Sequence, residues 1–130
     1  MEKVCRDWAK QAFGEGLVNA NYWDEFATNA QTAAAEVYKV KDFAAGEAKL
    51  KELLAQYAPK EIIAVGGEEN PALHDIYERI AKDGTQIYTD KFDIYDHRDS
   101  AYVGISSSEF CVSETGSLCV DNYSYEARVT

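Results

Sequence analysis

Apolar side chains recur at helical spacing along the first part of the chain. The stripe within residues 4–13 predicts a short amphipathic helix that is ended by two glycines. A second stripe predicts a helix from Tyr22 to about Ala34, with Asn21 as its N-cap. The N-terminal region is therefore expected to be helical.

Two further helices carry clear start signals. Asp42 is the expected N-cap of a helix that runs from Phe43 to about Tyr57. Asn70 and Pro71 predict the start of another helix, which Gly84 ends.

Short β-type segments alternate with these helices. They are Val37–Val40, Ile62–Val65, Thr85–Tyr88 and Tyr102–Ser106. The continuous apolar run Ile62–Val65 is typical of a strand that is buried on both faces of a parallel sheet. The segment Thr89–Ser100 is interpreted as an acidic loop. This order predicts an α/β protein with a three-layer α/β/α arrangement around a mainly parallel sheet.

A β-hairpin is expected near residues 110–121. Its strands would be Phe110–Glu114 and Ser117–Asp121, with Thr115 and Gly116 in the turn. This register places Cys111 opposite Val120 and Cys119 opposite Val112, on opposite faces. A disulfide between these two cysteines is therefore not expected, and all three cysteines of the chain, which include Cys5, are interpreted as small buried hydrophobic residues.

Composition narrows the class of protein. The chain has 130 residues, 46% hydrophobic and 28% charged, which fits a single globular domain. Its net charge of −10 would repel nucleic acids and anionic membranes, so neither is an expected partner. The first residues have no apolar core of a signal peptide, and a cytoplasmic location is expected.

Two segments have a spacing that is compatible with a binding site. Gly66 and Gly67 lie between a strand and a helix, where an anion could bind, but Glu68 and Glu69 would oppose it. An acidic run with one imidazole could hold a cation, although it lacks the spacing of an EF-hand and is better read as a solvated surface: Asp90, Asp93, Asp96, His97 and Asp99. His74 is likewise expected on the surface, and no metal site is predicted.

The stretch Val103–Val120 is the densest candidate for chemistry. Glu114 stands beside a glycine turn, where free backbone amides could bind an anion or oxyanion and the carboxylate could act as a base or nucleophile. The alternative is a purely structural turn in which Glu114 satisfies the turn amides.

This stretch, "VGISSSEFCVSETGSLCV", resembles the signature of the LUD-domain family, the lactate utilization protein C group. Upstream, "WDEFATNAQTAAAEVYKVKDF" and "KEIIAVGGEE" resemble the family's first long helix and strand and its second strand. The resemblance rests on six residues: Gly104, Ser106, Glu114, Thr115, Gly116 and Ser117. It implies a fold similar to the sugar-phosphate isomerase and CoA-transferase superfamily.

The resemblance also implies a role in oxidation of L-lactate to pyruvate, as a subunit or accessory protein beside iron-sulfur partner proteins. No cofactor is expected on this chain, and any cluster would belong to the partners. A homo-oligomer is a further possibility, because relatives continue beyond the position of Arg128 and the C-terminal part of the domain is expected to be missing. The alternative function is a stand-alone enzyme, similar to a CoA transferase or sugar-phosphate isomerase, with Glu114 as the catalytic group and the amides of Gly66, Gly67, Gly116 and Ser117 as anion binders.

Overall fold

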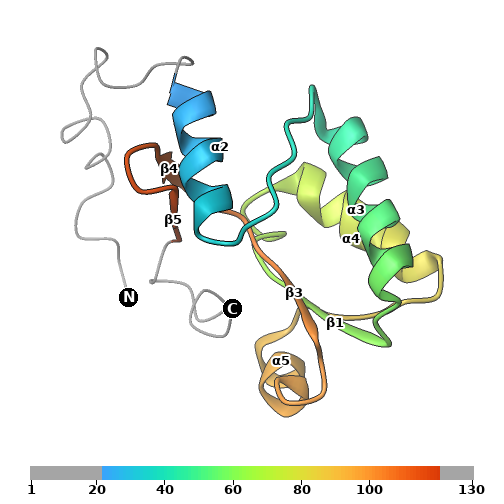
Figure 1. Ribbon diagram of the computed structural model, residues 1–130. Helices are drawn as coiled ribbons and strands as arrows, with labels where there is room; N and C mark the ends of the chain where they lie inside the picture. The colour runs from blue at the N-terminus through green and yellow to red at the C-terminus, as the bar shows by residue number, and fades with distance from the viewer. Residues whose placement is uncertain (1–21, 121–130) are drawn as a thin grey trace. The chain divides into compact units, whose positions relative to one another are not determined.

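The computed structural model describes residues 22–120, which divide into two compact units. Figure 1 shows their elements. The first unit contains the helix α2 (Trp23–Thr32) and the strands β4 (Phe110–Val112) and β5 (Ser117–Cys119). The second contains α3 (Phe43–Tyr57), β1 (Glu61–Ala64), α4 (Pro71–Lys82), β2 (Gln86–Tyr88), α5 (Lys91–His97) and β3 (Val103–Ile105). The helix predicted within residues 4–13 lies outside the described residues.

The second unit is built on a parallel sheet with strand order β2-β1-β3. In the central strand, Ile62 pairs with both Ile87 and Val103. Side chains of β1 alternate between the two faces of the sheet because successive residues of a strand point to opposite sides. One face therefore receives Ile62 and Ala64, and the other receives Ile63.

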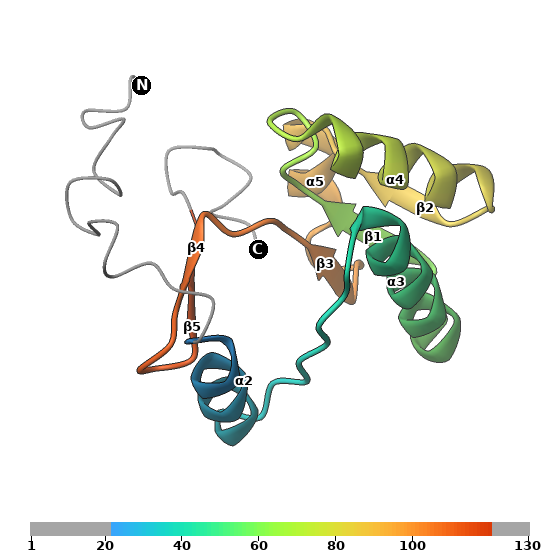
Figure 2. The same ribbon diagram turned by 90° about the horizontal axis from the view of Figure 1, so that it is seen from above.

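Helices cover both faces of this sheet, as Figures 1 and 2 show. On one face, Leu54 of α3 and Tyr77 of α4 pack with Ile62 and Ala64. On the other face, Ile94 of α5 packs with Ile63 and Val65. The prediction of a three-layer α/β/α fold is thus confirmed.

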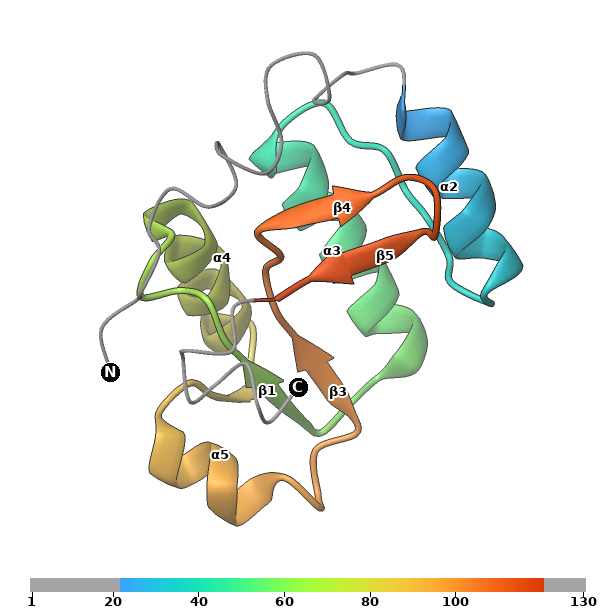
Figure 3. The ribbon, with the colours of Figure 1, turned by 90° about the vertical axis from the view of Figure 1, so that its left-hand side faces the viewer.

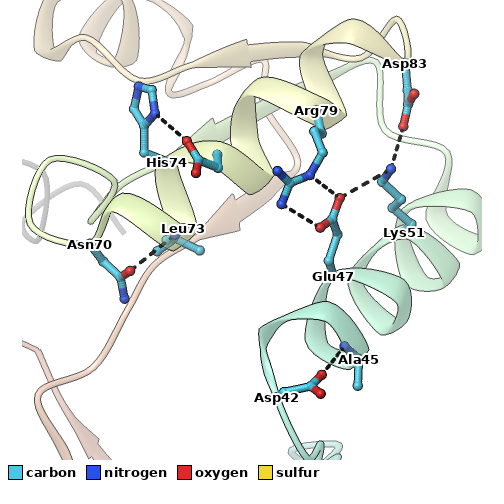
Figure 4. Close-up of polar contacts among 10 residues, drawn as sticks. Asp42, Ala45, Glu47, Lys51, Asn70, Leu73, His74, Arg79 and Asp83 are labelled. Carbon is cyan, nitrogen blue, oxygen red and sulfur yellow. Dashed lines mark hydrogen bonds and ion pairs between the residues drawn. The ribbon is translucent and has the colours of Figure 1, made fainter.

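The predicted caps of the two long helices are confirmed, and Figure 4 shows both. The side chain of Asp42 accepts a hydrogen bond of 2.8 Å from the amide of Ala45. Asn70 accepts from the amides of Ala72 and Leu73 at 3.1 and 3.3 Å. These bonds satisfy N–H groups that have no partner within the helix.

Charged side chains connect α3 to α4 on their outer surfaces (Figure 4). Arg79 donates two hydrogen bonds of 2.8 Å to the carboxylate of Glu47. Lys51 lies 3.0 Å from Asp83 and 3.5 Å from Glu47. The bonds from Arg79 hold the pKa of Glu47 below its usual value. Because Arg79, Lys51 and Asp83 are largely exposed to solvent, these ion pairs add little to stability.

Two predicted features of the N-terminal part of the chain are corrected. The segment 37–40 is not a strand, and Val40 is exposed. A β-type sequence forms a strand only when a partner supplies its hydrogen bonds, and no described strand lies beside this one. The helix α2 begins at Trp23 with Tyr22 as its N-cap residue and no side-chain cap, and it ends before the predicted Ala34, which has a φ of 70°.

The predicted acidic loop over residues 89–100 contains a helix, so that prediction was wrong. Asp90 accepts a hydrogen bond of 2.8 Å from the amide of Phe92 and caps α5. Ile94 is fully buried beneath the helix. This seven-residue helix buries only Ile94 and leaves Phe92 and Tyr95 exposed, so its apolar positions give too little periodicity to predict a helix from the sequence.

The hairpin forms where it was predicted but with a different register (Figure 3). Phe110 pairs with Cys119, and Val112 with Ser117, so the turn spans the four residues Ser113–Gly116 and β5 ends at Cys119. Cys111 now lies opposite Leu118. The two cysteines still lie on opposite faces and are free thiols, as predicted, but Cys111 is exposed and Cys119 half-buried, so the expectation of buried cysteines was wrong for both. Cys5 lies outside the described residues.

Between residues 22 and 120, the chain has no helix with the length and apolar character needed to span a membrane.

Candidate functional site

The predicted site residues fall into two groups, one in each unit. Glu114, Thr115, Gly116 and Ser117 belong to the hairpin unit. The remaining residues, which belong to the sheet unit, are Gly66, Gly67, Gly104 and Ser106.

The hairpin turn is fixed to helix α2 by one side chain, that of Asn29. Its amide nitrogen donates to the main-chain carbonyl of Ser113 at 2.8 Å and to that of Glu114 at 3.0 Å. An asparagine amide has two N–H donors, so a single side chain can satisfy two successive carbonyls. The side chain of Asn29 therefore holds the turn through its main-chain carbonyls.

The conformation and surroundings of Gly116 explain why the turn has a glycine at this position. Its φ of +67° lies in the left-handed region that side chains disfavour. A Cβ placed there would lie 2.3 Å from the amide nitrogen of Ala30 and 2.6 Å from the carbonyl carbon of Asn29. The neighbouring atoms are helix backbone, which cannot move aside as a flexible side chain could. Gly116 is thus needed both for its conformation and for the close approach of the turn to α2.

The outward side of the turn presents polar groups to solvent. The carboxylate of Glu114 is exposed and makes no hydrogen bond or ion pair with any residue in the described range. Thr115 donates from its hydroxyl to that of Ser117 at 2.8 Å. The amide of Gly116 donates to the carbonyl of Val112 at 2.9 Å, whereas those of Glu114 and Thr115 make no hydrogen bond within residues 22–120.

The carboxylate of Glu114 makes no hydrogen bond to the turn amides within residues 22–120. The turn is instead held by Asn29 and by the contact at Gly116. Its exposed acid and free amides could meet a ligand or a partner protein, but none of the described residues is placed to activate Glu114 as a nucleophile.

The second group lies where the loops after β1 and β3 meet. The amide of Val65 donates to the carbonyl of Ile105 at 2.8 Å, which extends the pairing of the two strands. Gly66 has a φ of +87°, and a Cβ there would lie 2.5 Å from the hydroxyl oxygen of Ser107. Gly67 packs closely against Tyr77 of α4. The positive φ of Gly66 favours glycine there, whereas a Cβ at Gly67 would lie 3.3 Å from the Tyr77 ring.

The strand order makes this loop region the topological switch point of the sheet. The chain leaves β1 for β2 on one side and later returns to β3 on the other, and such points are common ligand crevices in α/β proteins. Ser106 is exposed there, but Gly104 lies within β3, opposite Ile63, rather than at the strand end. The first free amides of α4 are already occupied by Asn70, and Glu68 and Glu69 are exposed beside them.

A polar cluster that the sequence analysis did not find connects α5 to the sheet. The ring of His97 stacks on that of Tyr88, with centroids 3.8 Å apart and planes 7° apart. Glu61 accepts a hydrogen bond of 3.2 Å from Tyr88 and lies 3.6 Å from Nδ1 of His97. The pKa of Glu61 is lowered, most strongly by a hydrogen bond from Ser100, and less by the hydrogen bond from Tyr88 and the charge of His97. No sequence spacing links these residues, which come from three separate elements.

Asp90 is the residue of the acidic run with a capping role in α5. The remaining aspartates are exposed, as is His74. No set of three histidine, cysteine, aspartate or glutamate side chains within the described ranges is arranged to hold a metal ion.

The fold and the motif together define a class of protein: a three-layer α/β/α unit followed by a hairpin whose Ser-Glu-Thr-Gly turn is fixed to a helix. A comparison with protein-family models matches the LUD domain over residues 23–130, and the chain belongs to this family. LUD domains are associated with lactate utilization proteins. Searches of curated proteins and of solved structures gave no match.

Proposed function

We propose that this chain is a subunit or accessory protein of an L-lactate oxidation system and acts together with iron-sulfur proteins. The observation that carries the proposal is the match to the LUD domain, which extends over residues 23–130. The structural use of the motif turn agrees with a role in binding or positioning, because the turn is held by α2 and presents its polar groups outward.

The chemistry of lactate oxidation favours a division of labour. Conversion of lactate to pyruvate removes two electrons and two protons from the carbinol carbon and its hydroxyl, so an electron acceptor is required. Clusters of the common type are held by four cysteine thiolates, and this chain has three cysteines in total. Cys111 and Cys119 also lie on opposite faces of the hairpin. We therefore assign the clusters, and the passage of electrons, to partner subunits.

Glu114 carries the alternative, a stand-alone enzyme that acts on a CoA thioester or a sugar phosphate. A carboxylate nucleophile or base is usually oriented by neighbouring groups. Glu114 has no such neighbour among the described residues, and this is the reason for preferring the subunit role.

The proposal is tested by affinity capture of the full-length chain from cells grown on lactate, under anaerobic conditions. We expect co-purification of proteins that contain iron and acid-labile sulfide, together with electron transfer from lactate to an artificial acceptor. Capture of the chain alone, without iron or activity, would overturn the proposal.

A pair of variants then separates the two functions. Glu114→Gln removes the charge of the turn, and Glu78→Gln removes an exposed charge on α4 as the matched control. Under the subunit role, the isolated chain turns over neither a CoA thioester nor a sugar phosphate, and Glu78→Gln retains lactate-dependent electron transfer in the reconstituted complex. If Glu114→Gln instead abolishes turnover of a CoA thioester or a sugar phosphate by the isolated chain, the alternative enzyme is correct.

A further inference from the structure

Helix α5 presents an exposed face that combines aromatic and acidic side chains. Ile94 and His97 point toward the sheet, where they contact its core and Tyr88. The opposite side carries residues at the spacing of one helical face, and all of them are exposed. We define this acidic aromatic patch as Phe92, Asp93, Tyr95 and Asp96.

The aromatic rings of the patch are open to solvent. Phe92 is 69% exposed and Tyr95 is 54% exposed, on a helix of only seven residues. Large apolar side chains that cluster on a surface commonly mark a protein contact site. Removal of both rings from water would favour association.

The two rings already bind cations from their own chain. The ammonium of Lys91 lies 5.0 Å from the centre of the Phe92 ring, and the guanidinium of Arg98 lies 4.4 Å from that of Tyr95. Both distances are within the range of a cation–π interaction. Each ring thus has cation–π geometry with a residue of its own chain, and an arginine or lysine of a partner would take the place of that residue.

The charge around the patch favours the same kind of partner. Between residues 90 and 99, four aspartates stand against one lysine and one arginine, in a chain whose net charge is −10. Asp90 caps the helix and Asp99 lies 3.9 Å from Arg98, whereas the carboxylates of Asp93 and Asp96 are exposed on the patch. Complementary charge guides docking and sets its specificity.

We propose that the acidic aromatic patch of α5 docks a basic surface of a partner protein, one whose arginine or lysine side chains stack on Phe92 and Tyr95 and pair with the neighbouring aspartates. That this partner is an iron-sulfur subunit rests on the proposed function. The rings, the charges and the cation contacts support the docking surface independently of that function.

The experiment compares variants of the full-length chain in the lactate-grown capture assay and in a direct titration with an octa-arginine peptide. Phe92→Ser combined with Tyr95→Ser removes both rings without changing net charge. The matched control is Tyr57→Ser, which removes a ring that is 61% exposed on α3, at the other face of the sheet. Circular dichroism and hydrogen exchange confirm that each variant is folded.

We expect the double variant to bind the peptide about 5- to 30-fold more weakly and to lose the iron-sulfur partner, while Tyr57→Ser behaves as wild type. A variant with Asp93→Asn and Asp96→Asn should weaken binding in a salt-dependent manner. Equal peptide binding by the double variant and wild type would show that only net charge attracts the peptide, and would overturn the inference. Capture of the iron-sulfur partner by wild type and double variant alike would also overturn it, whereas no capture by wild type would count against the proposed function alone.

Discussion

Substitution of Gly116 by alanine should release the motif turn from helix α2. Two costs act at this position. A residue with a Cβ in the left-handed conformation loses about 1–2 kcal/mol, and overpacking of a tight contact costs about 1–3 kcal/mol more. Because the atoms that a new Cβ would meet at 2.3–2.8 Å all belong to the backbone of α2, we expect a total loss of about 2–5 kcal/mol in the stability of the hairpin unit.

Gly84 provides a control for the cost of placing a Cβ on a backbone with positive φ. It also has a positive φ, +101°, but a Cβ there would meet nothing within 4 Å. Gly84→Ala should therefore cost only about 1–2 kcal/mol. Asparagine tolerates the left-handed conformation that Gly116 adopts, but Gly116→Asn should remain as damaging as Gly116→Ala because its Cβ would meet the same backbone of α2.

Hydrogen exchange followed by mass spectrometry measures these effects locally. Gly116→Ala should accelerate exchange in peptides from residues 23–32 and 110–119 by at least about 30-fold, since each tenfold corresponds to about 1.4 kcal/mol. Gly84→Ala should affect only the segment 71–88, and more weakly. Equal effects of the two alanine variants, or rescue of position 116 by asparagine, would refute the steric argument.

Three further predictions concern the sheet unit. Ile94→Ala should destabilise it by about 2–5 kcal/mol, measured by urea unfolding, because the side chain is fully buried against Ile63 and Val65; a loss below about 1 kcal/mol would contradict this packing. Asn70→Ala should cost about 0.5–2 kcal/mol and Asn70→Asp much less, since an aspartate retains the capping oxygen; equal losses would argue against the cap. The pKa of Glu61 is lowered in the folded state, so its ionised form stabilises the fold above pH 4.5, and this stability is lost as the pH falls through the lower folded pKa. The difference in unfolding free energy between wild type and Glu61→Gln, measured by urea titration, should therefore shrink on acidification. A difference that does not change with pH would contradict this role.

Local signals in the sequence determined the elements whose start and end are chemically marked. Asp42 and Asn70 capped the helices where they were predicted, because their side chains act on amides only two or three residues away. The run Ile62–Val65 became the central strand, since a segment that is apolar on both sides can be satisfied only between two layers. The motif that indicated the LUD family was likewise a local pattern.

Contacts between distant residues decided the rest. The hairpin register differs from the predicted one because the turn has four residues and brings Gly116 against α2. No pattern within residues 110–121 could encode this contact. The same is true of Asn29, whose amide binds carbonyls more than eighty positions away along the chain. Helix α5 forms within an acidic segment in which Ile94 is buried against the sheet, and segment 37–40 forms no strand, since none of the described strands pairs with it. Such contacts gain their free energy from burial and from hydrogen bonds across the fold, and therefore exist only in the tertiary structure.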